Sequence, residues 1–432
     1  MADRPALPHH DPGATELVPA TQVAEWPPGT FLENIAPLAD GRFLVTNKDG
    51  ARIERVGLDG DRTLFATLPE GVTGVDVGAA GEVYATGRVK GGPETVYRVD
   101  AGGRVEVLAE LPTAGFLNGL TRIGPHTLLV ADSGTATVWK VDTATGTASP
   151  WLVDELLGHR DPAHRFPATT WIPGANGVKR FRDAVFVSST DRALVLRVPL
   201  GTDGGAGEPV VWARDVVVDD FAFDLDGNLY GTTHPFSSVV RIRPDGSRST
   251  IATGAEGVVG ATAVAFGTRP GDECSLYVVG NSRIPFDGRG DHPARLVRLQ
   301  LEAPGYPRYH HRVDAARVRQ VPRLQCWIVT TRTLPGTEEQ RRAQAPAYTA
   351  HLERHLHQML LGGQVQDGPG GPVSTRFYLL RTADAATARA VIETSPYHRH
   401  GVYTVVDVQP FTGMGGELMH GVAWVPKTNP AA

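Results

Sequence analysis

Six copies of one pattern, a short alternating strand followed closely by a second strand, constrain the fold of this 432-residue chain more than any other feature. The second strand of each pair ends in Arg-Val or a close variant. The pairs recur roughly every 40 to 60 residues, which is the length of one four-stranded propeller blade. We expect the first strands at residues 42–46, 82–86, 127–131, 184–188, 228–232 and 275–279, and the second strands at 52–56, 95–99, 137–141, 194–198, 239–242 and 295–299.

Turn residues separate these strands at the places where tight hairpins need a positive φ angle. Examples are Asp59-Gly60, Gly102-Gly103, Asp226-Gly227 and Asp245-Gly246. The 50 glycines and 33 prolines of the chain also favour a turn-rich all-β structure over a helical one. The sequence therefore predicts an all-β six-bladed β-propeller over residues 21–302, preceded by a flexible tail at residues 1–20.

The charge pattern excludes several classes of partner. The net charge is −5 and the basic residues are scattered, so we expect no binding of nucleic acid. No apolar run approaches the ~20 residues of a membrane helix, and residues 1–25 lack the apolar segment of a signal peptide. Cys274 and Cys326 are far apart in sequence and do not suggest a disulfide framework, so we expect a cytoplasmic protein.

Polar residues recur at one position in the repeats, directly before or at the start of the innermost strand of each blade. Side chains at this position converge on the central channel of a propeller although they are far apart in sequence. The six positions hold Glu33, Thr73, Asn118, Asn176, Asp219 and Thr262. Carboxylate and amide oxygens of this kind suit Ca²⁺, Mg²⁺ or Mn²⁺, and they suit Zn²⁺ less well.

A structural explanation of the same residues stays open, because Asn-Gly and Asp-Asp sequences are common in turns. Four carboxylate or amide side chains at one position nevertheless favour a site, since two buried carboxylates are costly without a cation. Lys179 and His234 are further candidates for contact with a substrate or for proton transfer. The alternative for both is a purely structural role.

The motifs around these residues resemble the regucalcin (senescence marker protein) and gluconolactonase family of propeller lactonases, over about residues 21–301. The resemblance implies that Glu33, Asn176 and Asp219 bind a divalent metal ion, with Ca²⁺ as the first choice, and that Asn118 faces the substrate. The motifs at 175–179, 219–224 and 262–267 also resemble a divergent branch of gluconolactonase-like proteins from secondary metabolism, in which some relatives catalyse cyclisations.

The pattern changes after residue 302, and residues 303–322 are expected to be a linker. Strands are expected at 326–331, near 364, at 375–380 and at 403–408, and helices at 337–361 and 384–393. This order is β-α-β-β-α-β and predicts an α+β ferredoxin-like domain over residues 323–420, followed by a tail at 421–432.

The second domain resembles the YciI-like family over about residues 324–411. That family forms dimeric α/β-barrels and has a His paired with an Asp. His351 matches the His, whereas Ser395 stands at the position of the Asp, beside Tyr397. An imidazole without its carboxylate loses the partner that raises its basicity, so we expect a dimerisation module here. The chain is therefore expected to be a homodimer.

The leading functional hypothesis is a metal-dependent lactone or ester hydrolase that acts on a small molecule. The metal ion would serve as a Lewis acid, Asp219 as a possible base and Asn118 as a group that orients the substrate, with Thr73 and Thr262 lining the wall. Two alternatives stay open: a cyclase or pericyclase of the hetero-Diels–Alder type in a natural-product pathway, and a non-catalytic propeller that binds a small molecule or a protein.

Overall fold

The chain folds into two compact units, residues 1–312 and residues 313–432, and each is described by itself. The computed structural model describes residues 7–422 except 79–80, 125, 162–163, 165–170, 202, 270, 282–291, 307–323, 368–370 and 417–420. The predicted linker and the predicted C-terminal tail therefore lie mostly outside the described residues.

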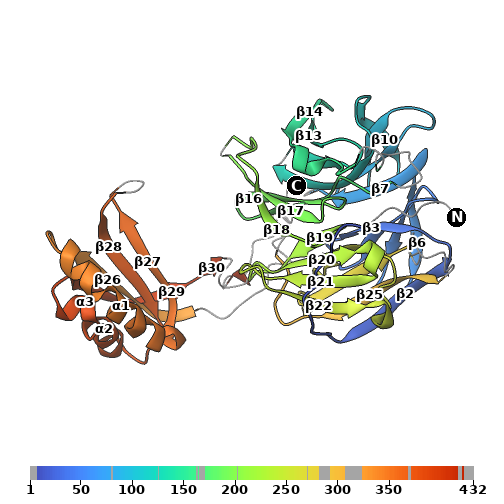
Figure 1. Ribbon diagram of the computed structural model, residues 1–432. Coiled ribbons are helices and arrows are strands. Elements are labelled where there is room, and N and C mark those ends of the chain that lie inside the picture. Colours follow the sequence, from blue (N-terminus) through green and yellow to red (C-terminus); the bar gives the residue numbers. More distant parts are fainter. Residues whose placement is uncertain are drawn as a thin grey trace, which may run out of the picture. The chain divides into compact units, whose positions relative to one another are not determined.

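The first unit is the predicted six-bladed propeller, and its sheets surround a common centre (Figure 1). Every predicted strand pair is present, as the second and third strands of a blade. Blades one to four follow one another in the chain. Their strands are β3 (Leu32–Pro37), β4 (Phe43–Asn47), β5 (Arg52–Val56) and β6 (Arg62–Thr67); β7 (Glu70–Val77), β8 (Val83–Arg88), β9 (Glu94–Val99) and β10 (Val105–Leu111); β11 (Leu117–Gly124), β12 (Thr127–Asp132), β13 (Thr137–Asp142) and β14 (Ala148–Val153); and β15 (Ala175–Phe181), β16 (Ala184–Ser189), β17 (Leu194–Pro199) and β18 (Val210–Arg214).

Blades five and six receive strands from the start of the chain. Blade five contains β19 (Phe221–Phe223), β20 (Leu229–Thr233), β21 (Ser238–Ile242) and β22 (Arg248–Thr253), with β1 (Ala14–Thr15) parallel to β22. Blade six contains β23 (Ala261–Phe266), β24 (Ser275–Gly280), β25 (Pro293–Gln300) and β2 (Ala20–Pro28). Because β2 pairs antiparallel with β25, the two ends of the propeller sequence close the ring.

The N-terminal segment differs from the flexible tail that we expected. β1 pairs with β22, and the amide of Val18 donates to the carbonyl of Ile251. These bonds join segments more than 200 residues apart in the sequence, so no local pattern could predict them. The segment belongs to the outer edge of blade five.

The apolar core of the propeller lies between adjacent blades. One cluster joins Phe43 and Val45 of blade one to Tyr277 and Val279 of blade six, and another joins Phe186 of blade four to Phe223 of blade five. Within the described part of the chain, each of the six blade interfaces has such a cluster. Both faces of each sheet are therefore buried, and the blades hold their inner strands in fixed positions around the centre.

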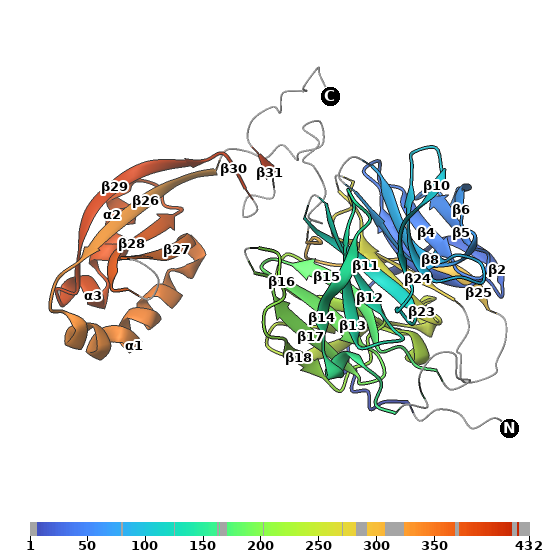
Figure 2. The same ribbon diagram turned by 90° about the horizontal axis from the view of Figure 1, so that it is seen from above.

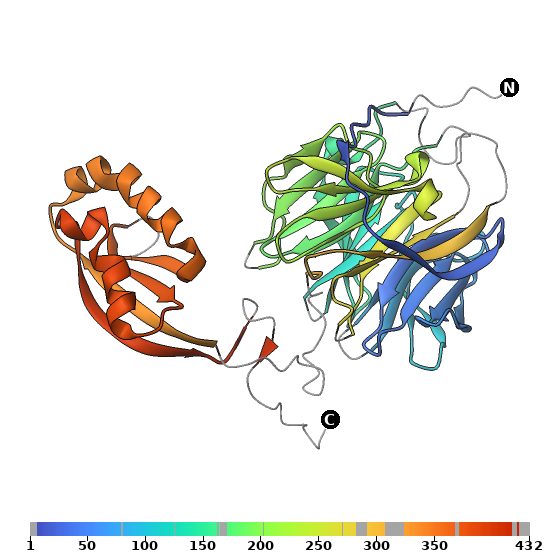
Figure 3. The same cartoon turned by 90° about the horizontal axis from the view of Figure 1, so that it is seen from below.

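The second unit has the predicted ferredoxin-like topology, with helices over one face of a four-stranded antiparallel sheet (Figures 2 and 3). The order of strands in the sheet is β27-β28-β26-β29. The elements are β26 (Leu324–Thr333), α1 (Glu338–Arg354), β27 (Met359–Gln366), β28 (Val373–Leu380), α2 (Ala385–Glu393), α3 (Pro396–Arg399) and β29 (Tyr403–Gly413), followed by β30 (Gly415–Gly416) and β31 (Gly421–Val422).

The prediction for the first helix of this unit was too long. The helix ends at Arg354, and Met359, which we placed inside it, begins strand β27.

Both cysteines are free, and no helix among the described residues has the length and apolarity that crossing a membrane requires.

Candidate functional site

The inner strands of the propeller are interrupted where the predicted site residues lie. Strand pairing skips from Leu32 to Ile35, from Val72 to Val75, from Leu117 to Leu120 and from Ala175 to Val178, with a smaller shift between Ala261 and Ala263. Glu33, Thr73, Asn118, Asn176 and Thr262 occupy these β-bulges. A bulge turns a side chain away from the regular alternation of a strand. In blade five, Asp219 lies just before β19.

A ring of hydroxyl groups fixes the bulges of adjacent blades against each other. Each hydroxyl donates to a backbone carbonyl of the following blade, and the sixth bond returns to blade one. The donors and acceptors are Thr46 to Thr73 (2.9 Å), Thr86 to Asn118 (2.7 Å), Ser133 to Ala175 (2.6 Å), Ser188 to Asp219 (2.8 Å), Thr232 to Thr262 (2.8 Å) and Thr262 to Leu32 (2.9 Å). The ring thus holds the backbone at each site position or at the residue directly before it, and it uses no side chain of Glu33, Asn176 or Asp219.

The Asn-Gly sequences at 118–119 and 176–177 are not turns, because both lie inside inner strands. A Cβ atom at Gly119 would lie 2.7 Å from the Asn176 carbonyl oxygen, and one at Gly177 would lie 2.8 Å from the Asp219 carbonyl oxygen. These glycines therefore allow the backbones of adjacent blades to approach closely. This finding removes the turn explanation of the two asparagines.

Blades four and five bring Asn176 and Asp219 into direct contact. The Asn176 amide nitrogen donates to Asp219 Oδ1 at 2.6 Å and to Thr190 Oγ1 at 3.0 Å. Its amide oxygen accepts no hydrogen bond from a described residue. Because both donor bonds orient the amide, this oxygen is free to bind a ligand beside the Asp219 carboxylate.

The Glu33 carboxylate belongs to the same cluster. Glu33 is only 8% exposed, and its carboxylate accepts no hydrogen bond from a described side chain or backbone. Burial raises the pKa of Glu33, while the nearby Lys48 lowers it and Asp49 and Asp220 raise it further. Among the described residues, the charge of Lys48 offsets only part of the cost of burying this carboxylate, and no hydrogen-bond donor adds to it.

Asp219 shows the same effect more strongly. Burial raises the pKa of Asp219 well above its ordinary value, and the charges of Glu33 and Asp220 raise it further. The hydrogen bond from Asn176 and the charge of Lys48 act in the opposite direction. Glu33 and Asp219 are therefore close enough to repel each other when both are ionised.

These residues fit a hard divalent cation. Two buried carboxylates and an amide oxygen that accepts no hydrogen bond from the described part of the chain supply the oxygen ligands that Ca²⁺, Mg²⁺ and Mn²⁺ prefer. No group of three or more His, Cys, Asp or Glu side chains suited to a metal occurs in the part of the chain that the structure describes, so the amide is needed to complete a set of three. A cation here would remove the repulsion between the two carboxylates.

Asp220 has a different role from its neighbour Asp219. Its carboxylate lies 2.5 Å from Lys179 Nζ and accepts a hydrogen bond of 3.3 Å from the Asn34 amide. The pair with Lys179 is almost buried, with side-chain exposures of 12% and 4%. Lys179, which we considered for substrate contact, thus neutralises Asp220, and Asp219 remains the carboxylate of the open cluster.

Two predicted wall residues use their hydroxyl groups elsewhere. Thr73 donates to the Leu117 carbonyl at 2.8 Å, and Thr262 donates to the Leu32 carbonyl at 2.9 Å. Neither hydroxyl therefore has its proton free for a substrate. Asn118 differs, because its amide nitrogen donates only weakly to Ser133 Oγ at 3.3 Å and its oxygen accepts no bond from a described residue.

His234 lies beside Asp219 at the end of β20. Its Nδ1 is 3.6 Å from Asp219 Oδ2, and its Nε2 is 2.6 Å from the Asn281 amide nitrogen. If Nε2 accepts the amide proton, Nδ1 carries the ring proton and faces the carboxylate. His234 is thus positioned by Asn281 to support Asp219.

Lys48 and the aromatic rings around it were not predicted from the sequence. Lys48 Nζ lies 4.4 Å from the centre of the Phe31 ring and 5.4 Å from that of the Phe116 ring. Phe31 and Phe116 each stand two positions before a polar site residue, Glu33 and Asn118 respectively. This shared spacing was the signal that could have identified them.

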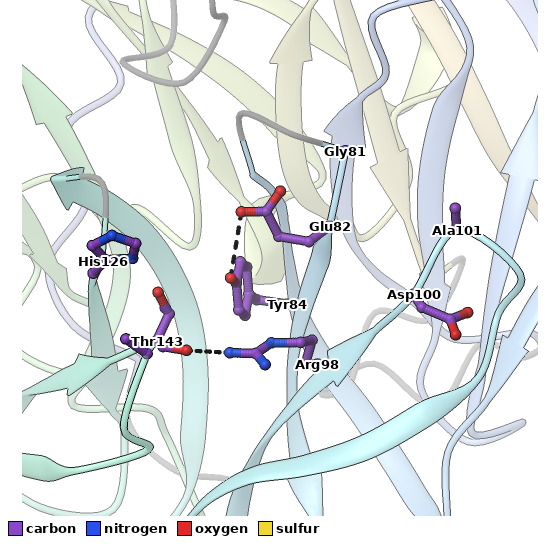
Figure 4. A pocket seen from close by; sticks show the side chains of 9 residues that line it. Gly81, Glu82, Tyr84, Arg98, Asp100, Ala101, His126 and Thr143 are labelled. Atoms are coloured by element: carbon purple, nitrogen blue, oxygen red, sulfur yellow. Dashed lines mark hydrogen bonds between the residues drawn. The ribbon is translucent and has the colours of Figure 1, made fainter. Parts of the chain in front are cut away.

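A separate cavity of about 500 Å³ lies between blades two and three, and Figure 4 shows its lining. It is lined by Glu82 and His126, which belong to the turns that follow the inner strands β7 and β11. The predicted residues lie toward the starts of these strands, so this cavity is at the opposite end of the blades. It contains none of the predicted site residues.

The candidate residues of the second unit do not form a catalytic pair. His351 is 4% exposed, and its Nε2 is 2.7 Å from the Val391 carbonyl. The Ser395 hydroxyl is 2.7 Å from the Tyr403 hydroxyl and accepts from the His398 amide at the start of α3. Burial lowers the pKa of His351. Tyr397 stacks on Tyr348 with ring centres 3.8 Å apart, as part of the core.

Comparison with known proteins gives separate results for the two units. Residues 326–412 match the model of the YCII-related domain family. No curated protein matches the chain.

Solved structures match the propeller. A gluconolactonase from Xanthomonas campestris is 15% identical with a TM-score of 0.51, and the match covers 69% of this chain and 98% of that one. Regucalcin from Agrobacterium tumefaciens, a calcium-binding protein, is 16% identical with a TM-score of 0.51 over 67% and 98% of the two chains. A luciferin-regenerating enzyme is 12% identical with a TM-score of 0.53 over 67% and 98%. The chain thus consists of a six-bladed propeller, which has the fold of gluconolactonase and regucalcin, and a C-terminal YCII-related domain.

Proposed function

We propose that the propeller is a metal-dependent lactone or ester hydrolase. One observation carries the proposal: Glu33, Asn176 and Asp219, from three different blades, form a buried cluster whose side-chain oxygens accept only one hydrogen bond from the described residues, the bond from Asn176 to Asp219. The similarity of fold to a gluconolactonase supports this choice of reaction.

Glu33, Asn176 and Asp219 would hold the ion, with calcium as the first choice. When bound, a divalent cation polarises an ester carbonyl and lowers the pKa of water. Asp219 is placed to accept a proton, since its Oδ1 is fixed by Asn176 and its Oδ2 faces His234. His234 supports the charge of this carboxylate, and the free amide oxygen of Asn118 can orient a hydroxyl group of the substrate.

The test combines metal analysis with hydrolysis of a panel of lactones. We expect one divalent ion per chain, loss of hydrolysis with a chelator, and recovery when the ion is added back. Glu33→Gln and Asp219→Asn should each lower kcat/KM by at least about 100-fold, within the range that positioned electrostatic groups contribute. Asp245→Asn, at an exposed turn of blade five, is the matched control and should behave as the wild type.

Two outcomes would contradict the proposal. Unchanged hydrolysis in both variants would remove Glu33 and Asp219 from the mechanism. Conversion of a conjugated substrate that survives the chelator, without any lactone hydrolysis, would instead favour a cyclase in the same channel.

We also propose that the C-terminal unit pairs with a second copy of this chain. Leu361 and Val365 of β27 and Val406 of β29 expose apolar side chains at 37%, 47% and 50%. Burial of these side chains against a second copy would remove apolar surface from water.

A further inference from the structure

Three aromatic side chains lie just before the inner strands that carry the carboxylate and amide cluster, and we call them the aromatic wall: Phe31, Phe116 and Trp171. Phe31 directly precedes β3, Phe116 directly precedes β11, and Trp171 lies shortly before β15. All three therefore lie at the end of the propeller where Glu33, Asn118 and Asn176 enter the channel. Each of the three residues is partly buried.

Contacts between the rings connect the wall to the site. The centres of Phe116 and Trp171 are 4.9 Å apart, and those of Phe31 and His234 are 6.1 Å apart. His234 in turn lies 3.6 Å from Asp219. The aromatic surface thus reaches from the connection between blades three and four to the carboxylate that we assign as the base.

Lys48 holds the wall together. Its ammonium group lies against both Phe31 and Phe116, and such cation–π contacts are attractive. The two rings, from blades one and three, are thereby fixed relative to each other. A wall that is fixed before binding loses little entropy when a flat ligand packs on it.

Several polar side chains near the cluster are already bonded within the protein. In the described residues, the hydroxyls of Thr73 and Thr262 are bonded to backbone carbonyls, and Lys179 is bonded to Asp220. A lactone with many hydroxyl groups needs several hydrogen-bond partners, and leaving buried polar groups unpaired is costly. The wall offers apolar and aromatic contact in their place.

We infer that the site takes a lactone or ester that carries a flat aromatic or conjugated ring, packed against Phe31, Phe116 and Trp171. This inference specifies the substrate class of the proposed hydrolase and rests on that proposal for the reaction, although binding can be tested without turnover. Aromatic packing favours such ligands over aliphatic lactones of equal ring size.

The test measures binding of two probes to the full chain by isothermal titration calorimetry. Coumarin carries a benzo ring fused to a six-membered lactone, and δ-valerolactone has the saturated six-membered lactone ring alone. We expect coumarin to bind at least about tenfold more tightly. Phe31→Leu and Phe116→Leu should each weaken coumarin binding by about tenfold, the effect of ~1.4 kcal/mol, and should leave δ-valerolactone unchanged.

Phe65→Leu is the matched control, because Phe65 is a partly buried phenylalanine on β6, the outermost strand of blade one. It should bind coumarin as the wild type does. Thermal unfolding of all variants checks that they are folded. Equal binding of the two probes by the wild type would overturn the inference, as would wild-type coumarin binding in both wall variants.

Hydrolysis of dihydrocoumarin and δ-valerolactone separates this inference from the proposed function. If neither is hydrolysed, but coumarin binding depends on Phe31 and Phe116, the assigned reaction is wrong and the ligand class stands. If both are hydrolysed with equal kcat/KM and neither wall variant changes the ratio, the hydrolase stands and the aromatic preference is wrong.

Discussion

At the scale of single residues, the site depends on two carboxylates that burial keeps from ionising easily. Glu33 and Asp219 both have raised pKa values, with burial as the largest cause. A folded state with raised carboxyl pKa values binds more protons than the unfolded state. The contribution of these two groups to stability is therefore greatest below the unfolded pKa, near 4, and is lost as the pH rises through the folded pKa.

The metal-free protein should show this dependence. We expect the free energy of unfolding of chelated wild-type protein, measured in urea, to fall relative to that of Asp219→Asn as the pH rises above about 4. Asparagine keeps the size of the side chain and removes the ionisation. Parallel pH profiles for the two proteins would show that Asp219 ionises normally in the folded chain.

The polar residues of the site could be predicted from the sequence because they share one position in a repeat. Glu33, Asn176 and Asp219 were among the six candidates found in this way, and the resemblance to the gluconolactonase and regucalcin family implied that these three bind the metal ion. Lys48, Phe31 and Phe116 were missed because an isolated lysine or phenylalanine in a loop has many possible roles, and only the arrangement of the blades brings them together. The use of the Thr73 and Thr262 hydroxyls by the backbone likewise depends on contacts between blades.

At the scale of elements, the bulged inner strands place the site, and glycines permit the close contact of neighbouring strands. Gly119 and Gly124 lie in the same strand, β11, and provide a direct comparison. A Cβ atom at Gly119 would lie 2.7 Å from the Asn176 carbonyl oxygen, whereas the nearest atom to one at Gly124 would be 3.5 Å away.

We expect Gly119→Ala to lower the free energy of unfolding by about 1–3 kcal/mol, the usual cost of overpacking. Because the displaced carbonyl belongs to Asn176, metal affinity should also fall. Gly124→Ala should change neither quantity by a comparable amount. Equal unfolding midpoints for the two variants in urea would show that the bulges tolerate a wider separation of the blades.

Strands with an apolar face were predicted well, and edge strands were not. β4 and β8 are almost fully buried and were located within a residue or two at their starts. β6 exposes four of its six residues, so it has no clear apolar alternation. The first helix of the second unit was extended too far because Met359 and Leu361 continue its apolar pattern into β27.

At the scale of the whole molecule, the two units are proposed to divide the work, with chemistry in the propeller and association through the C-terminal unit. We expect light scattering after gel filtration to give twice the 46.2 kDa mass of one chain. Val406→Asp should shift the protein toward the monomer, because an aspartate buried in an apolar interface is costly.

Val107→Asp, on the exposed edge strand β10 of the propeller, serves as the control and should remain dimeric. A wild-type monomer at all accessible concentrations would refute the proposed association. A dimer that persists in Val406→Asp and dissociates in Val107→Asp would move the interface to the propeller.

Anomalous diffraction from crystals soaked in Mn²⁺ will show whether Glu33, Asn176 and Asp219 together hold a divalent cation. We expect one strong anomalous peak in the channel, within about 2.6 Å of the two carboxylates and of the Asn176 amide oxygen. A channel without a peak, or a peak bound by other residues, would contradict it.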